Sequence, residues 1–146
     1  MASSNRLARS LLLVLRVALG AVFLYAAWTK LREPWPIFAM AIDAYGVLPE
    51  RAVMVVARTL PWAELAIGLL LIAGLWRRVA TPAASLVLLL FFGLMVRAYA
   101  QGKQIDCGCF GLGEAISWRT LLRDGSLLAG SLLLTLVSLR GGRNNA

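Results

Sequence analysis

The two cysteines of this 146-residue chain, Cys107 and Cys109, are separated by a single glycine. They lie in the short segment Asp106–Gly111, which also carries a carboxylate. Two thiols at this spacing can exchange with a disulfide, pair with each other or bind a soft metal ion. Because glycine has no side chain, nothing between the two sulfurs would obstruct their approach. The pair is therefore the predicted chemical centre.

Redox exchange is the chemistry that this spacing favours. A disulfide between residues i and i+2 closes a very small ring, in which the preferred torsion of about 90° is hard to reach. Strained and exposed disulfides are the more oxidising and labile ones. The carboxylate of Asp106 could accept a proton during exchange, so Cys107, Cys109 and Asp106 form the predicted catalytic set.

Two other interpretations of the cysteine pair stay open. The first is contact with a metal or cofactor, but zinc usually takes four ligands and the chain has no histidine. Asp106, Glu114 or a partner chain would have to complete such a site, so no metal site is assigned. The second is an inert disulfide or two unpaired thiols. A bridge across so short a loop would restrict the unfolded chain little, which makes it a poor structural cross-link.

The composition indicates an integral membrane protein. Hydrophobic residues make up 60% of the chain and charged residues only 15%, far from the usual balance of a soluble domain. The net charge of +8 is spread between apolar runs instead of being gathered on one soluble face. We therefore expect membrane lipid around the chain and no nucleic-acid partner.

The hydrophobic pattern predicts an all-α fold, with residues 1–146 forming one membrane domain. The expected architecture is a four-transmembrane-helix bundle with a short interfacial helix, over about 37–45, between the first two spans. Pro61 is expected to break or kink the second span, and Ser117 to cap the fourth. The predicted spans are 7–28, 61–76 with a kinked extension from 52, 79–99 and 118–139, with the Cys-Gly-Cys loop at 101–116.

The first span could also be a cleaved signal peptide. Its apolar run is long, however, and Arg16 would split the hydrophobic core of such a peptide, so we interpret it as a retained helix. Four spans place both termini and the Arg77-Arg78 turn on one side. Basic residues are denser there, which predicts cytoplasmic termini. The cysteine loop would then be periplasmic or extracellular, where a disulfide can persist.

Charged residues near the span ends form a second constellation. Lys30, Glu64 and Arg97 should lie at one level, together with Arg123 and Asp124, just beneath the cysteine loop. A carboxylate such as Glu64 is costly in hydrocarbon unless it is paired or neutral. The set could be a polar pocket that shuttles protons or holds a quinone head group; alternatively, it could be a group of ion pairs that fixes helix packing.

Arg16 lies deeper and is expected to snorkel. The five tryptophans fall at span ends and are interpreted as interfacial anchors: Trp28, Trp35, Trp62, Trp76 and Trp118.

With these residues in view, the chain resembles the methylamine-utilisation MauE group of the DoxX-like membrane proteins. The resemblance implies a multi-pass inner-membrane protein that helps mature a periplasmic enzyme, with the disulfide-rich small subunit of methylamine dehydrogenase as the named client. The broader family includes a small subunit of a thiosulfate:quinone oxidoreductase. The motifs that carry the resemblance are the helix start Arg16–Leu24, Lys30-Leu31 before Pro34, Tyr45–Pro49, Pro61–Glu64 with Gly68 and Gly74, and the Cys-Gly-Cys-Phe-Gly block of Asp106–Gly111.

These observations predict a membrane-embedded thiol–disulfide exchange protein in which Cys107 and Cys109 cycle between dithiol and disulfide. Its partner would be a periplasmic client or redox protein, and a quinone near Lys30, Glu64 and Arg97 could exchange the electrons. One alternative is a non-catalytic membrane assembly subunit of a quinone-linked oxidoreductase. Another is a metal-handling protein.

Overall fold

The computed structural model describes residues 2–103 and 115–144. Asp106, Cys107 and Cys109 lie outside the described residues. The helices are α1 (Ala2–Leu31), α2 (Trp35–Asp43), α3 (Glu50–Ala73), α4 (Arg77–Ala100) and α5 (Trp118–Asn144). Among the described residues, four helices are long and apolar enough to cross a membrane: Asn5–Leu31, Glu50–Ala73, Arg78–Ala100 and Trp118–Arg140. The prediction of an all-α membrane bundle with a short helix between the first two spans is confirmed.

Prolines and glycines set several helix boundaries. α1 ends at Leu31, shortly before Pro34, and Pro34 then precedes α2 as its N-cap. α3 begins directly after Pro49. At the end of α3, Gly74 adopts a φ of 75°, and its backbone N–H donates to the carbonyl oxygen of Leu70 at 2.9 Å. Glycine adopts this left-handed geometry without the steric strain that a side chain would cause, and the geometry ends the helix.

Ser117 caps α5 as the sequence predicts. The backbone N–H of Thr120 donates to Ser117 Oγ at 3.5 Å, and the backbone N–H of Ser117 donates to Thr120 Oγ1 at 2.9 Å. This reciprocal pattern satisfies amide groups that the first turn of a helix leaves without partners. The cap fixes where the chain enters α5.

The second span includes the predicted extension before Pro61 but no break at that residue. α3 begins at Glu50 and ends at Ala73, so Pro61 lies inside an unbroken helix and is buried. The break expected at Pro61 does not occur, because neighbouring helices and side chains can compensate for a missing amide within a transmembrane helix. Two residues before Pro61, Thr59 Oγ1 donates to the carbonyl oxygen of Val55 at 2.7 Å. The added residues 50–60 give α3 the length that a span starting at Pro61 would lack.

The long helices pack as two pairs. α1 lies mainly against α3 and α4 mainly against α5, while the contacts between the pairs are fewer. In the first pair the backbones approach closely, since a Cβ added to Gly20 would lie 2.9 Å from the carbonyl oxygen of Gly68. In the second pair, Ser85 Oγ donates to Ser131 Oγ at 3.1 Å. We call the line between the two pairs the seam.

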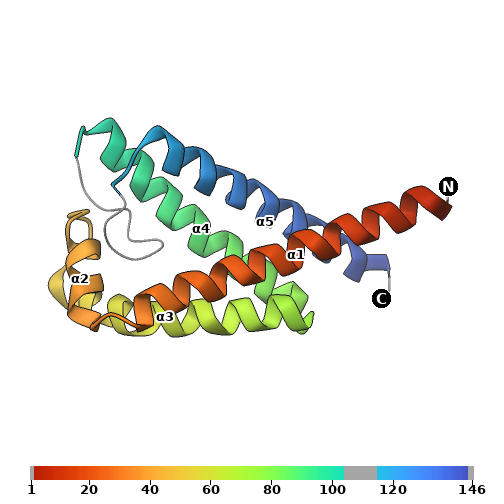
Figure 1. Ribbon diagram of the computed structural model, residues 1–146, viewed down its shortest axis with the longest axis horizontal. Helices are drawn as coiled ribbons and strands as arrows, with labels where there is room; N and C mark the ends of the chain where they lie inside the picture. The colour runs from red at the N-terminus through yellow and green to blue at the C-terminus, as the bar shows by residue number, and fades with distance from the viewer. Residues whose placement is uncertain (1, 104–114, 145–146) are drawn as a thin grey trace.

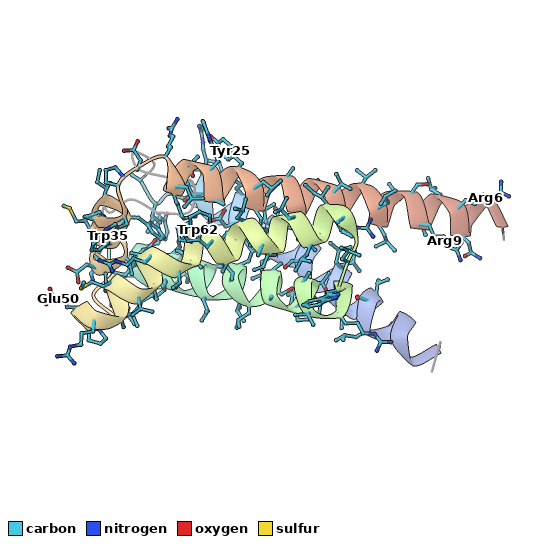
Figure 2. The ribbon with its side chains drawn as sticks, turned by 90° about the horizontal axis from the view of Figure 1, so that it is seen from below. Arg6, Arg9, Tyr25, Trp35, Glu50 and Trp62 are labelled. Carbon is cyan, nitrogen blue, oxygen red and sulfur yellow. The ribbon has the colours of Figure 1, made fainter. Side chains whose placement is uncertain are left out.

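The two ends of the bundle differ in construction. Both termini and the turn between α3 and α4 lie at one end, and α2 crosses the other (Figure 1). Figure 2 shows Arg6 and Arg9 at the first end, far from Trp35 and Glu50 at the second. We call these the terminal end and the α2 end. Each carries its own set of charged residues.

The apolar side chains divide between a core along the seam and an outer surface. A buried cluster joins the two helix pairs through residues such as Leu19, Phe23, Leu71 and Ala84. Many other large apolar side chains point outward, among them Val14, Val55 and Leu122, which are 65%, 61% and 61% exposed. Such a surface would be unstable in water and suits hydrocarbon.

Candidate functional site

A buried ion pair joins α1 to α3 near the α2 end. Lys30 Nζ lies 2.9 Å from Glu64 Oε2 and 3.1 Å from Glu64 Oε1, so the ammonium group contacts both carboxylate oxygens. The two side chains are only 1% and 5% exposed. Removing both charges from water is costly, and such a pair persists only when its geometry is good. The sequence prediction that Lys30 and Glu64 lie at one level is consistent with this contact.

Aromatic rings complete the surroundings of Lys30. Its Nζ lies 5.4 Å from the ring centroid of Phe38 on α2 and 5.9 Å from that of Phe91 on α4. A cation at these distances from a ring is attracted by the ring quadrupole. Lys30 therefore links α1 to α2, α3 and α4 through one ammonium group.

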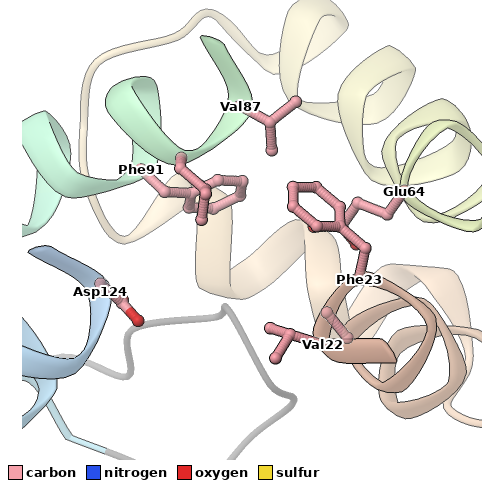
Figure 3. A pocket seen from close by; sticks show the side chains of 8 residues that line it. Val22, Phe23, Glu64, Val87, Phe91 and Asp124 are labelled. Atoms are coloured by element: carbon pink, nitrogen blue, oxygen red, sulfur yellow. The ribbon is translucent and has the colours of Figure 1, made fainter. Parts of the chain in front are cut away.

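A small cavity separates Glu64 from a second buried carboxylate. The cavity measures about 30 Å³, room for about two water molecules. In Figure 3, Glu64 and Asp124 line opposite sides of the cavity, with Phe23 and Phe91 among the residues between them. Asp124 is itself buried and accepts a hydrogen bond from Arg123 Nε at 3.0 Å. The cavity is too small for a quinone head group, but it could hold water between the two carboxylates.

A much larger apolar groove adjoins this cavity. It measures about 580 Å³, the size of a typical small-molecule site, and it shares Val87 and Phe91 with the cavity. Phe91 thus touches both the groove and the surroundings of Lys30. The groove is lined by Ile42, Tyr45, Val47, Leu48, Val56, Leu60, Val87, Leu89, Leu90, Phe91, Gly93 and Leu94.

The family of the chain follows from comparison with known proteins. The family model described as "Methylamine utilisation protein MauE" matches residues 8–137. The chain belongs to the MauE family. No solved structure matches it.

Two curated MauE-family relatives are similar over most of the chain. The "Methylamine utilization protein MauE" of Paracoccus denitrificans is 36% identical over 123 residues, which is 82% of this chain and 66% of that protein. The protein of the same description from Paracoccus versutus is 36% identical over 121 residues, 81% of this chain and 64% of that protein. The chain therefore spans slightly less than two thirds of these MauE proteins.

The structure brings together some of the predicted site residues of this MauE-family chain. Lys30 and Glu64 form an ion pair, and Glu64 shares a cavity with Asp124. Arg97 is different, because its side chain is exposed on the last turns of α4 and forms no ion pair with Glu64 in the described part of the chain. The predicted catalytic residues Asp106, Cys107 and Cys109 fall outside the described residues. Where the structure is described, it contains no group of three or more His, Cys, Asp or Glu side chains that could hold a metal ion.

Sequence reasoning missed the aromatic partners of Lys30. Phe38 belongs to a short helix that was interpreted as lying on the membrane, and Phe91 lies in an apolar run with several similar residues. Nothing in spacing distinguishes Phe91 from Phe92 before the rotation of α4 is known. The available signal was the position of Lys30 directly after a long apolar run, because a cation in an apolar setting requires partners.

Proposed function

We propose that this MauE-family protein is a membrane-embedded thiol–disulfide exchange protein that helps to mature an enzyme outside the cytoplasm. Cys107 and Cys109 are the reacting pair, with Asp106 as a proton acceptor. The client proposed from the family is the disulfide-rich small subunit of methylamine dehydrogenase. The proposal places the protein in a cell inner membrane with cytoplasmic termini.

One observation carries the proposal: the only two cysteines lie between α4 and α5, within the region matched by the MauE model. The described residues on either side belong to the α2 end. Lys103 Nζ would lie 3.7 Å from a Cβ added to Gly46, and Ile116 packs in one buried cluster with Tyr45. The described residues that flank the cysteine segment in sequence, Lys103 and Ile116, therefore lie at the end that holds the Lys30–Glu64 pair.

The proposed reaction transfers two electrons and two protons. A thiolate of the client attacks the Cys107–Cys109 disulfide, forming a mixed disulfide and releasing one thiolate of the pair. The second client thiolate then attacks the mixed disulfide. The client gains a disulfide, and Cys107 and Cys109 end as a dithiol. A quinone regenerates the pair by accepting the two electrons and two protons and leaving as a quinol.

The apolar groove beside Phe91 is the proposed quinone site. Its volume and apolar lining suit a ring with a hydrocarbon tail, whereas the cavity between Glu64 and Asp124 suits only water. We propose that this cavity carries protons between the two carboxylates and the quinone. Lys30 holds Glu64 in place through contacts to both carboxylate oxygens.

The decisive experiment combines thiol labelling with substitution of each cysteine. In intact cells, a membrane-impermeant thiol reagent should label Cys107 and Cys109 only after mild reduction. Cys107→Ser and Cys109→Ser should each abolish client maturation, measured as the fraction of client with native disulfides. Maturation that continues in both variants would overturn the exchange proposal and favour a non-catalytic assembly subunit.

Topology requires its own control. In a background lacking both cysteines, Glu33→Cys at the α2 end should react with the impermeant reagent, and Asn5→Cys at the terminal end should not. Both positions are exposed, so burial cannot explain a difference between them. Labelling with the reverse pattern would contradict the proposed orientation.

The quinone step can be tested by filling the groove. A Cβ at Gly93 would meet no atom within 4 Å, so Gly93→Leu should occupy the groove without disturbing the helix. Reoxidation of the dithiol by added quinone should slow by about tenfold or more, because lost apolar contact of 1–2 kcal/mol corresponds to roughly that factor. Ala129→Leu, on the exposed face of α5, is the matched control. Equal rates in both variants would exclude the groove.

A further inference from the structure

A second groove lies at the terminal end, far from the Lys30–Glu64 pair. It measures about 390 Å³ and combines basic, hydroxyl and apolar side chains. It opens between α1 and α5, with one residue from α4. The groove is lined by Arg9, Leu12, Leu13, Arg16, Thr81, Leu134, Val137 and Ser138.

Arg16 contributes to this groove a buried polar atom that has no hydrogen-bond partner among the described residues. This atom is its Nε. The guanidinium group packs over Gly74, where an added Cβ would lie 3.1 Å from Arg16 Nη2. The position at the C-terminus of α3 favours a cation through the helix dipole. That partial charge does not replace a bound anion.

The helix segments at the terminal end carry no acidic side chain. No aspartate or glutamate occurs in residues 1–32, 65–105 or 125–146. These stretches contain all of α1 and α4, the last turns of α3, and most of α5. No acidic side chain in these stretches neutralises Arg9 and Arg16, so the groove suits an anion that comes from outside the chain.

The arrangement of the lining matches the two parts of a phospholipid. Arg9 and Arg16 are seven residues apart, so they share one face of α1 at about 10 Å along its axis, and long side chains can converge over that distance. Leu12, Leu13, Leu134 and Val137 provide an apolar surface beside them. Basic pockets between transmembrane helices are known recognition sites for anionic lipid head groups.

We propose that this groove binds an anionic phospholipid, with its phosphate held by Arg9 and Arg16 and an acyl chain along the leucines. Arginine suits this task because its planar guanidinium donates two parallel hydrogen bonds to phosphate oxygens. Binding supplies the partner that Arg16 Nε lacks within the described protein. The site ties α1 to α5 at the terminal end.

Native mass spectrometry of the full chain tests this proposal. The detergent-purified protein should retain phosphatidylglycerol in preference to phosphatidylcholine. The double substitution Arg9→Gln/Arg16→Gln should weaken phosphatidylglycerol binding about thirtyfold, since each arginine near an anionic head group contributes a factor of about five. Arg9→Gln alone should weaken it about fivefold. Arg9 is exposed, so this single variant avoids any effect on folding.

The matched control removes two charges from the same end without touching the groove. Arg6→Gln/Arg140→Gln replaces two exposed arginines and should leave phosphatidylglycerol binding within about twofold of the unmodified protein. An equal loss in this control would mean general surface attraction and would overturn the proposal. Unchanged binding in Arg9→Gln/Arg16→Gln would also overturn it. If inorganic phosphate alone raises the melting temperature as much as phosphatidylglycerol does, the groove binds a free anion, and the lipid proposal is overturned.

Discussion

The two ends of the bundle deal with charge in opposite ways. At the α2 end, Lys30 and Glu64 neutralise each other in a nearly dry setting, and Asp124 pairs with Arg123. At the terminal end, Arg9 and Arg16 line a groove in a region whose sequence contains no acidic residue. At the α2 end, charges near hydrocarbon are thus neutralised by other side chains of the protein. At the other end, the proposed source of the neutralising charge is a molecule from the bilayer.

The largest expected effect follows from breaking the Lys30–Glu64 pair. Glu64→Gln leaves the buried ammonium of Lys30 without its counter-charge, which should destabilise the protein by about 3–5 kcal/mol. Lys30→Met should cost a similar amount. The double variant Lys30→Met/Glu64→Gln should be more stable than the sum of the two losses predicts, because it leaves no unpaired charge. Thermal unfolding in detergent measures all three, and strictly additive losses would contradict direct coupling.

A smaller effect is expected at Asp124. Its side chain is 4% exposed but that of Arg123 is 34% exposed, so the arginine can regain water when the carboxylate is lost. Asp124→Asn should therefore cost about 1–3 kcal/mol in unfolding free energy. Arg123→Gln should cost at least as much as Asp124→Asn, since it removes the cation that donates a hydrogen bond to this buried carboxylate. The reverse order in thermal unfolding would show that Asp124 has a stronger partner than Arg123.

Arg16 should behave differently from Lys30 although both are cations within the first membrane-crossing helix, Asn5–Leu31. In detergent without phospholipid, Arg16→Met should change the unfolding free energy by no more than about 0.5 kcal/mol. The increase in melting temperature on adding phosphatidylglycerol should be much smaller in this variant than in the unmodified protein. A large loss of stability without lipid would instead show that Arg16 is satisfied by the protein itself.

The smallest expected effect is that of salt concentration, which should distinguish the two ends of the bundle. Exposed charges are screened by ions, whereas buried pairs are screened much less. The stabilisation by phosphatidylglycerol should therefore fall as sodium chloride is raised. The coupling between Lys30 and Glu64, obtained from the same double-variant cycle, should stay nearly constant. A coupling that falls with salt would mean that the pair is reached by water.

The helices of this protein could be predicted from sequence because each is a long apolar run. Hydropathy and the positions of proline and glycine located the spans to within a few residues at most boundaries. The second span was predicted with a break or kink at Pro61 and an extension from residue 52. α3 is one helix from Glu50 to Ala73, because the hydrogen bond lost at a proline matters less within a packed membrane helix.

The site was predictable only in part. Lys30 and Glu64 could be placed at one level from the lengths of their helices, because axial depth follows from residue number. Rotation about the helix axis does not follow in the same way. Arg97 was expected at the end of its helix near Glu64; it lies in the last turn of α4, and its side chain is exposed. Predicting Phe91 beside Lys30 would have required the packing angle between α1 and α4. The role of Cys107 and Cys109 stays a prediction.

The seam between the two helix pairs has a consequence for how ligands reach this protein. The cavity beside Glu64, the groove beside Phe91 and the groove beside Arg16 are each lined from both sides of the seam. The two grooves adjoin outward-facing apolar helix surfaces, so a ligand enters them by lateral diffusion within the bilayer. Their occupancy therefore depends on the mole fraction of the ligand among the lipids and not on its aqueous concentration. A change in membrane composition would alter both sites without any change in the surrounding solution.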